Sequence, residues 1–455
     1  GQEGGGAESL PRQVWCSSPC FFNSSLHAAN VKHMAMKTAN TGCSCFCLDF
    51  SAGSAGFCAS FSQPQLVTDC IGEQSKLEAS DFRLERHAAY FKKHLQELPG
   101  IYKTMDTNRL TLLYFCVSGL DLLDLLGEVD KVTVIRYIYS QQSSLPDHGG
   151  FYGYPRLHFD SEEQDRCNNQ PHIANTYVAL AMLIILDDDL QRVNRQAVAA
   201  SLQKWQLPDG SFCCVHGISS LDSENDMRFV YCAACICYML DLWSAVDVER
   251  MAQFILSSQS YDSAFGMGPL TESHGGCTYC ALASLAMMGR LNNLPSKEAV
   301  IDWCIKRQHL GFQGRIEKPM DSCYSFWVGG SLSLLGVGHL LDGPSCARFL
   351  KSCESAALGG FQKFPEVKMP DLLHSYFSVC GLSLCGLLQP MNPLLNMSKR
   401  AFDGAAAGFQ TPPDCLPWRQ HSITNQQKED DAPLPFGSAQ GAQGAQGSRD
   451  TQGAK

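Results

Sequence analysis

The sequence lacks three features that mark common protein classes. Its longest apolar run, residues 177–186, is much shorter than the about 20 residues that a helix needs to cross a bilayer, so no membrane span is expected. The net charge of −10 argues against the basic surface that binds nucleic acid, so no nucleic-acid partner is expected. A convincing strand pattern of alternating apolar and polar residues is missing as well. Because no strand pattern is present, an all-α protein is the expected fold class.

The cysteines do not follow the pattern of a disulfide framework, although the chain has 23 of them. Many lie in apolar, helical stretches such as residues 231–240 and 374–385. Small secreted domains instead space their cysteines along a short, loop-rich chain. We therefore expect reduced, buried thiols and a cytoplasmic protein.

Composition divides the chain into three parts. Residues 1–80 are rich in Gly, Ser, Ala and Cys and show no hydrophobic periodicity, so we expect a segment that is disordered or foreign to the domain that follows. Residues 81–400 carry helical periodicity and form the expected domain. Residues 401–455 contain a repeated Gly-Ala-Gln unit and are predicted to be a low-complexity, disordered tail.

Amphipathic and more apolar helices alternate along the central part, and a turn with glycine and phenylalanine joins them. These turns recur every about 47 to 61 residues, which is typical of stacked helical hairpins. They lie at residues 149–151, 209–212, 264–266, 311–312 and 359–361. The expected helices are 81–98, 108–126, 132–142, 172–187, 191–205, 226–241, 247–258, 276–289, 296–308, 323–341, 345–353 and 374–388.

Such hairpins, with their apolar helices inside, are predicted to close into an α/α barrel, or toroid. Its central cavity would collect the loops at one end. Glycine suits the turns because it tolerates positive φ and close approach of another backbone. An open helical array without a cavity is the alternative.

One carboxylate, one thiol and one imidazole form the candidate metal site: Asp321, Cys323 and His374. Zinc accepts this ligand set, and three protein ligands leave its fourth position open, as catalysis requires. Asp321 and Cys323 are two residues apart, so we expect them at a helix N-terminus, where the helix dipole favours anionic ligands. The competing interpretation is an accidental Asp-x-Cys pair whose cysteine is a small core residue.

Cations and helix starts lie near this pair in the repeat. Arg315 and Lys318 precede Asp321 and suit phosphate oxygens, or else belong to an ordinary charged loop. His274 opens a helix whose N-terminus can receive phosphate, although a capping role fits it too. Arg228 and His172 open two further helices, and Arg228 is a candidate for gripping a substrate chain. Nearby aromatic residues form either core or an apolar wall suited to an isoprenoid: Phe115, Tyr177, Phe229, Tyr279, Phe326, Trp327 and Phe377.

Seven stretches carry a resemblance to a known family: residues 109–124, 172–194, 207–213, 223–240, 272–285, 314–332 and 371–384. They resemble the β subunits of protein prenyltransferases, most of all the geranylgeranyltransferase type I kind. The resemblance implies an α/α barrel, a catalytic zinc ion and a helical α subunit shared with farnesyltransferase. It also implies transfer of geranylgeranyl from its diphosphate to the cysteine of C-terminal CaaX motifs, found in small GTPases and similar proteins.

The resemblance also implies residue roles. It makes Asp321, Cys323 and His374 the zinc ligands. It assigns the diphosphate to His274, Arg315, Lys318 and Tyr324. It places Arg228 and Trp327 along the channel for the isoprenoid and the peptide. The pocket for the terminal CaaX residue, mostly Leu in this type, corresponds to His172, Ala174, Phe229 and Leu373.

Two positions indicate the type of prenyltransferase. Thr111 stands where farnesyltransferase has a bulky Trp, which leaves room for a fourth isoprene unit. Lys363 stands where farnesyltransferase has an Asp that engages magnesium, so magnesium is expected to be dispensable. The loop between Gly150 and His172 is shorter than the family pattern, and residues 363–370 run one residue longer.

Three alternatives stay open beside this interpretation. A farnesyltransferase β subunit is disfavoured by Thr111 and Lys363, and a Rab-type β subunit by the peptide-pocket residues. A non-catalytic toroid that binds isoprenoids or partner proteins would be free to lose its ligands, yet the ligand set and the cations are present.

Overall fold

The computed structural model describes residues 77–157, 159–161, 163–164, 168–215, 224–367 and 369–412. The predictions for residues 1–76 and 413–455 lie outside these residues. The more apolar helices are α3 (Arg109–Leu122), α6 (Ile173–Ile185), α8 (Met227–Leu240), α10 (Gly275–Met287), α12 (Tyr324–Leu334) and α14 (Leu372–Leu384). The helices that alternate with them are α2 (Leu84–Gln96), α4 (Lys131–Ser140), α7 (Arg195–Trp205), α9 (Val248–Ser257), α11 (Lys297–Lys306) and α13 (Gly343–Ser352).

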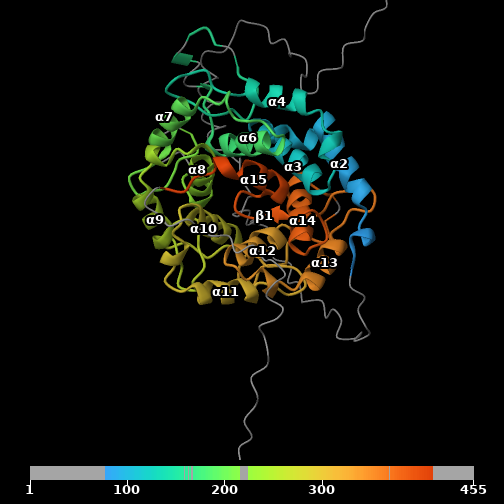
Figure 1. Cartoon of the computed structure of the whole chain (residues 1–455). Helices are drawn as coiled ribbons and strands as arrows, with labels where there is room; N and C mark the ends of the chain where they lie inside the picture. Colours follow the sequence, from blue (N-terminus) through green and yellow to red (C-terminus); the bar gives the residue numbers. More distant parts are fainter. Residues whose placement is uncertain are drawn as a thin grey trace, which may run out of the picture. The chain divides into compact units, whose positions relative to one another are not determined.

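The apolar helices form a closed inner ring. Each packs on its neighbours in the order α3, α6, α8, α10, α12 and α14, and α14 packs back on α3. The alternating helices lie around them, as Figure 1 shows. Nearly every residue of the inner helices is buried, which explains why these segments are apolar all round rather than on one stripe. The predicted toroid is therefore confirmed, and the open array is ruled out by the contact between α3 and α14.

The glycine/phenylalanine turns join five outer helices, α4, α7, α9, α11 and α13, to the inner helix that follows each of them in the same way. The turn phenylalanine is fully buried and pairs through its backbone with a residue at the end of the outer helix. These pairs are Gln142 with Phe151, Gln206 with Phe212, Gln259 with Phe265, Gln308 with Phe312 and Glu354 with Phe361. The repeat read from the sequence is thus a repeat of backbone geometry.

The glutamines also join successive outer helices. In three joints the Gln side-chain carbonyl accepts a hydrogen bond from the backbone N–H of the residue that caps the next outer helix: Asn194 for Gln142, Asp247 for Gln206 and Asp342 for Gln308. At the seam between the last and first hairpins, Glu354 takes this place and accepts from the backbone N–H of Arg83, at 2.6 Å. The side chains of Arg83, His87 and Lys351 also bind this buried carboxylate.

The C-terminal part of the domain fills the middle of the ring. Two short strands, β1 (Met391–Asn392) and β2 (Met397–Ser398), pair as a hairpin. Successive carbonyls of its loop, residues 393–396, accept hydrogen bonds from buried tyrosines of the inner helices: Tyr279, Tyr231, Tyr177, Tyr376 and Tyr114. We call this loop the plug. In Figure 1, β1 lies at the centre of the ring.

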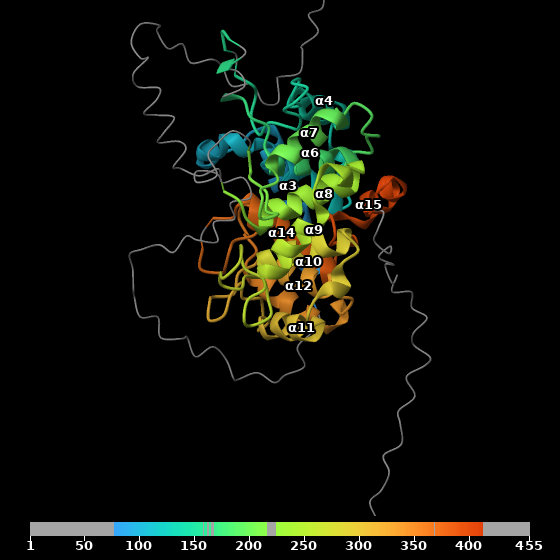
Figure 2. The same cartoon turned by 90° about the vertical axis from the view of Figure 1, so that its left-hand side faces the viewer.

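Helix α15 (Lys399–Ala405) follows the plug and ends the described domain with η7 (Ala406–Gly408). Figure 2 shows α15 at one end of the toroid, opposite the loops that lead into α10, α12 and α14. Arg400 fixes α15 by bonding Asp121 and the Ile185 carbonyl at the end of α6. Structure therefore continues past residue 400, where the sequence analysis ended the domain. The Ala- and Gly-rich sequence of α15 concealed it, because its position depends on these distant partners.

Two further differences concern the ends of elements. The predicted helix 323–341 is α12, which ends at Leu334, followed by the short helix η6 (Gly338–Leu340). Gly336 between them has a φ of +77°, which a continuing α-helix does not allow. The strands β1 and β2 were not predicted, because two residues are too few for an alternating pattern.

Candidate metal centre and its surroundings

The N-terminus of α12 positions two of the candidate ligands. Cys323 is the residue before the helix, and its backbone N–H donates to Oδ1 of Asp321 at 3.0 Å. The backbone N–H of Asp321 donates to the carbonyl of Phe312, the phenylalanine of the preceding turn. The repeat turn therefore fixes the Asp-x-Cys pair at a helix start, where the sequence placed it.

His374 reaches the same point from the first turn of α14. Its Nε2 lies 3.3 Å from Oδ1 of Asp321. Its Nδ1 lies 2.7 Å from Oδ2 of Asp371, which also caps α14 by accepting from the His374 backbone N–H. Asp371 was not among the residues predicted from the sequence, although an Asp three residues before a candidate ligand at a helix start was a usable signal. Carboxylates in this position orient a metal-binding imidazole and fix its tautomer.

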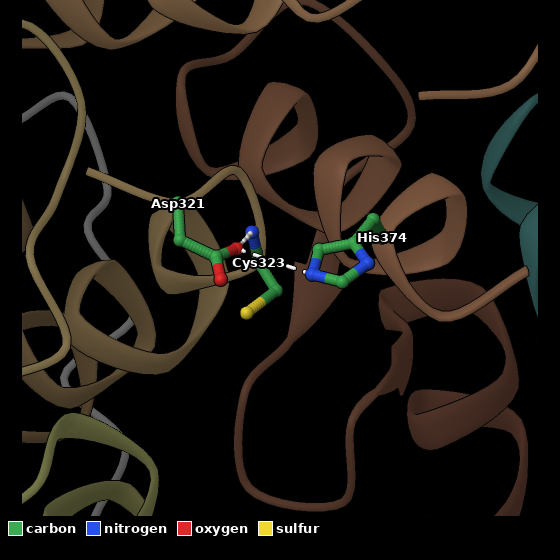
Figure 3. A group of neighbouring side chains, drawn as sticks. All are labelled: Asp321, Cys323 and His374. Carbon is green, nitrogen blue, oxygen red and sulfur yellow. Dashed lines mark hydrogen bonds and ion pairs between the residues drawn. The ribbon is translucent and has the colours of Figure 1, made fainter. Parts of the chain in front are cut away.

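The three side chains could hold a metal ion. Their ligand atoms all lie within 4.8 Å of one another, and Figure 3 shows them converging from α12 and α14. Burial and the Asp321 carboxylate raise the pKa of the Cys323 thiol to about 12. Burial opposes charge on His374, but Asp371 and Asp321 raise its pKa well above the ordinary value. A cation is the charge that would stabilise Cys323 as a thiolate here, so the donor set fits a metal.

A histidine–tyrosine pair lies beside this cluster. His274 caps α10, and its Nδ1 accepts from the backbone N–H of Gly276 at 3.0 Å. Burial and nearby Arg315 lower the pKa of His274 to about 3, so the ring is neutral and its hydrogen sits on Nε2. Nε2 lies 2.7 Å from the hydroxyl oxygen of Tyr324. The imidazole therefore donates to Tyr324, and the hydroxyl hydrogen of Tyr324 points elsewhere.

The predicted cations near the cluster lie in the loop before α12 and in the loop before α14. Arg315, in the loop before α12, pairs with Glu272 at 3.0 Å. Lys363 lies 3.8 Å from Oδ2 of Asp321, and its backbone carbonyl accepts from the Ser322 N–H at 2.8 Å. Lys318 is exposed in the same loop as Arg315, and the structure shows no ion pair between it and another described residue.

The remaining candidates lie deeper in the ring or on other inner helices. Arg228 is buried at the start of α8, paired with Asp226 at 2.6 Å and centred 5.5 Å from the Phe229 ring. His172 caps α6 and stacks edgewise on Phe229 at 5.9 Å, and Ala174 follows in α6. Trp327 packs on Phe377 at 4.4 Å.

Thr111 and Leu373 do not join these groups. Thr111 is buried in α3, where its hydroxyl donates to Oδ1 of Asn175 at 3.4 Å. Leu373 is half-buried in α14, next to His374, and the structure gives it no polar link to the other candidates. The structure therefore gathers Asp321, Cys323, His374, Tyr324, His274 and Lys363 around one point, with Arg315 beside them.

The family described as the prenyltransferase alpha-alpha toroid domain matches residues 82–397. The chain belongs to this prenyltransferase family. It is 41% identical over 349 residues to the geranylgeranyl transferase type-1 subunit beta of Arabidopsis thaliana, covering 72% of this chain and 92% of the relative. It is 40% identical over 342 residues to the subunit of the same name from Dictyostelium discoideum, covering 70% and 95%.

A solved prenyltransferase structure agrees with these relatives. The Candida albicans protein geranylgeranyltransferase-I complexed with GGPP has a TM-score of 0.65 and 26% sequence identity, covering 72% of this chain and 99% of that one. The predicted membership in the protein prenyltransferase β subunits, with the type I kind as nearest resemblance, is therefore confirmed, and the chain is an enzyme of the prenyltransferase class. Among the described residues, no helix is long and apolar enough to span a membrane.

Proposed function

We propose that this prenyltransferase is the catalytic β subunit of a type-1 protein geranylgeranyl transferase. It would transfer the geranylgeranyl group from geranylgeranyl diphosphate to the cysteine thiol of a C-terminal CaaX motif. The observation that carries the proposal is the convergence of the ligand atoms of Asp321, Cys323 and His374 within 4.8 Å of one another. They meet at the end of the toroid where the loops lead into α10, α12 and α14, which we call the loop end. The relatives named geranylgeranyl transferase type-1 subunit beta support the choice of isoprenoid.

The proposed metal is zinc, held by Asp321, Cys323 and His374. Bound zinc would supply a positive charge and an open position that keep the substrate cysteine as a thiolate. Asp371 would hold the His374 ring by its Nδ1–H, so that Nε2 faces the metal. In the reaction the substrate sulfur bonds to C1 of the isoprenoid as the C1–O bond breaks, and diphosphate leaves.

The diphosphate would lie at the start of α12, between the loop before α12 and the loop before α14. Tyr324 is suited to donate its hydroxyl hydrogen there, because His274 already donates to its oxygen. Arg315, Lys318 and Lys363 would add positive charge where negative charge grows as the C1–O bond breaks. Donors fixed in advance at that position stabilise the transition state more than the ground state.

Selectivity would depend on residues around this centre. Thr111 is small and buried in α3, which supports room for the longer isoprenoid. The His172–Phe229 contact, with Ala174 beside it in α6, supports the proposed pocket for a terminal Leu, and Leu373 of α14 is the member of this set that the resemblance alone assigns to it. Lys363 lies beside the metal cluster, which supports a reaction that does not need magnesium.

The proposed assembly is a heterodimer with the α subunit shared with farnesyltransferase, located in the cytoplasm. The solved complex with GGPP supports geranylgeranyl diphosphate as the second substrate. Residues 81–400 would make up the catalytic domain, extended by α15.

Co-expression with that α subunit tests the proposal. The purified heterodimer is assayed with geranylgeranyl and farnesyl diphosphate on peptides that end in Leu, Ser or Met, with and without magnesium. We expect the fastest transfer with geranylgeranyl diphosphate and the Leu peptide. A preference for farnesyl diphosphate would identify a farnesyltransferase, and binding of isoprenoid without transfer would identify a non-catalytic toroid.

A further inference from the structure

Two loops that face the metal centre are tied together at two points. The backbone N–H of Gly275 donates to the carbonyl of Gly314 at 2.8 Å. Three residues before Gly275, the carboxylate of Glu272 bonds Nη1 of Arg315 at 3.0 Å. Gly314 also lies flat against the Tyr324 ring, where a Cβ atom would come within 2.0 Å of the ring carbon Cζ. The position of Arg315 is thus set by a backbone link on one side and by a carboxylate on the other.

This carboxylate lies on the solvent side of the site. The Glu272 side chain is 58% exposed, whereas the Arg315 side chain is 29% exposed. Arg315 is close enough to His274 for its charge to be the second cause, after burial, of the lowered pKa of that ring. The guanidinium therefore bonds an exposed carboxylate, in a loop whose backbone is tied to the residue after His274.

We propose that Glu272 is a positioning residue that competes with the diphosphate for Arg315. Before substrate binds, it holds the guanidinium at the rim of the site. After transfer, it takes the guanidinium back and so helps the product diphosphate to leave. This inference rests on the proposed function, in which Arg315 binds the diphosphate.

The competition follows from the chemistry of the three groups. Carboxylate and phosphate oxygens both accept the N–H donors of a guanidinium, often in the same two-point geometry. An ion pair as exposed as this one is weak, so exchanging one acceptor for the other costs little. The negative charge of Glu272 also repels a bound diphosphate. Both effects lower the affinity for diphosphate, and they act on the product as well as on the substrate.

A loop-holding role alone predicts the opposite result. If Glu272 only kept Arg315 in place, its loss would leave the guanidinium less ordered and weaken diphosphate binding. The sign of the change in affinity therefore separates the two roles.

The test uses the heterodimer and inorganic diphosphate as the probe, with binding followed by calorimetry. Glu272→Gln keeps the size of the side chain and removes its charge. We expect it to tighten diphosphate binding by about two- to fivefold, the upper part of the range of a weak exposed ion pair. Unchanged or weaker binding would overturn the proposal.

Glu317→Gln is the matched control. Glu317 is an exposed carboxylate two residues from Arg315, so its loss changes the net charge near Arg315 by the same amount as the loss of Glu272. The structure shows no ion pair between Glu317 and another described residue. We expect diphosphate binding to change by less than about twofold, as for an ordinary surface charge. An equal tightening in Glu317→Gln would reduce the Glu272 effect to general electrostatics and overturn the proposal.

Two more measurements tie the effect to Arg315 and to product release. In an Arg315→Ala background, Glu272→Gln should no longer tighten diphosphate binding. In otherwise wild-type enzyme, Glu272→Gln should strengthen inhibition by added diphosphate by about the same factor as it tightens diphosphate binding. Tightening that persists without Arg315 would contradict the proposal. A wild-type heterodimer that neither binds diphosphate nor transfers would refute the proposed function itself, whereas normal wild-type behaviour with an unaffected Glu272→Gln variant would refute only this inference.

Discussion

The middle and the loop end of the toroid use polar groups in opposite ways. In the middle, the tyrosine hydroxyls of the inner helices meet the plug, residues 393–396, and the chain satisfies its own hydrogen bonds. At the loop end, Asp321, Cys323 and His374 bring three potential metal ligands within 4.8 Å of one another, with Lys363 and Asp371 at the edge of the cluster. Burial raises the pKa values of the tyrosines and of Cys323 alike, but only Cys323 lies beside two other potential metal ligands.

The difference teaches which buried polar groups serve structure and which serve chemistry. Buried polar groups cost free energy unless they are paired. The plug pairs its partners within the chain, so it closes and stabilises the ring. At the loop end, a bound cation would supply the positive charge that stabilises Cys323 as a thiolate, which is the arrangement expected of a metal site. Variants at the two places should therefore separate loss of catalysis from loss of stability.

The largest effect is expected for Cys323→Ala. Loss of the thiol should weaken metal binding and lower geranylgeranyl transfer by about 100-fold or more, because even partners one step behind a metal ligand matter by 10- to 100-fold. The free energy of unfolding should change much less than the activity. Cys304→Ala, in which a buried thiol of α11 is removed, is the control and should retain transfer.

Thr111→Trp should change selectivity at the loop end. A large ring in place of this buried Thr would fill space that the fourth isoprene unit is proposed to occupy, shifting the preference toward farnesyl diphosphate by about tenfold or more. Competition between the two diphosphates measures the shift, and Thr111→Ser serves as the control of similar volume. An unchanged ratio would contradict the assigned depth of the pocket.

Asn396→Ala should affect stability and leave the metal site intact. Asn396 has a φ of +53°, and its side chain accepts from Tyr376 at 3.2 Å. Its replacement should lower the free energy of unfolding by about 2 kcal/mol, from the lost bond and the strained backbone. Asn396→Gly should cost about half as much, because glycine tolerates this φ. Denaturant unfolding gives the free energy of unfolding of both variants. An Asn396→Ala variant with native stability but no bound metal would mean that the plug serves metal binding rather than stability.

Glu354→Gln tests an ionised group that serves structure although it lies at the loop end. Burial opposes ionisation, but hydrogen bonds from His87, Lys351 and the Arg83 backbone lower the pKa of Glu354 to about 2 from its ordinary 4.5. The stabilisation is therefore complete above pH 4.5 and is lost as the pH falls toward 2. Glutamine should cost about 1 to 2 kcal/mol at pH 7, and progressively less below pH 4.5.

The reverse exchange is the matched comparison for the seam. Gln308→Glu places a carboxylate where the amide of Gln308 donates to the Asp342 carbonyl at 2.9 Å, so it should destabilise the joint. Unfolding midpoints at pH 7 and at pH values below 4.5 test both variants. A Glu354→Gln variant as stable as wild type at pH 7 would show that the ion pairs of Glu354 contribute nothing to the free energy of unfolding.

The sequence predicted the repeating parts of this fold well. Apolar helices, glycine/phenylalanine turns and the start of α12 depend on local patterns, so their order and the Asp321–Cys323 pair could be inferred directly. His374, about fifty residues away, could be added because the repeat brings equivalent positions to the same end. The family resemblance supplied the roles of the cations.

The parts that were missed depend on contacts between distant segments. The plug and α15 have no strong local pattern, and their places are set by tyrosines and by Arg400 contacts far away in sequence. Glu272 looks like an ordinary exposed carboxylate until the structure shows Arg315 beside it. Glu354 replaces the glutamine of the other joints, but only closure of the ring reveals its partners Arg83 and His87.

The zinc content of the purified heterodimer is the most direct test of the central claim. Elemental analysis should find one zinc ion per β chain in wild type and in Asn396→Ala, and almost none in Cys323→Ala. Equal zinc content in wild type and Cys323→Ala, with Cys323→Ala still folded, would contradict the assignment of the loop end as the metal centre.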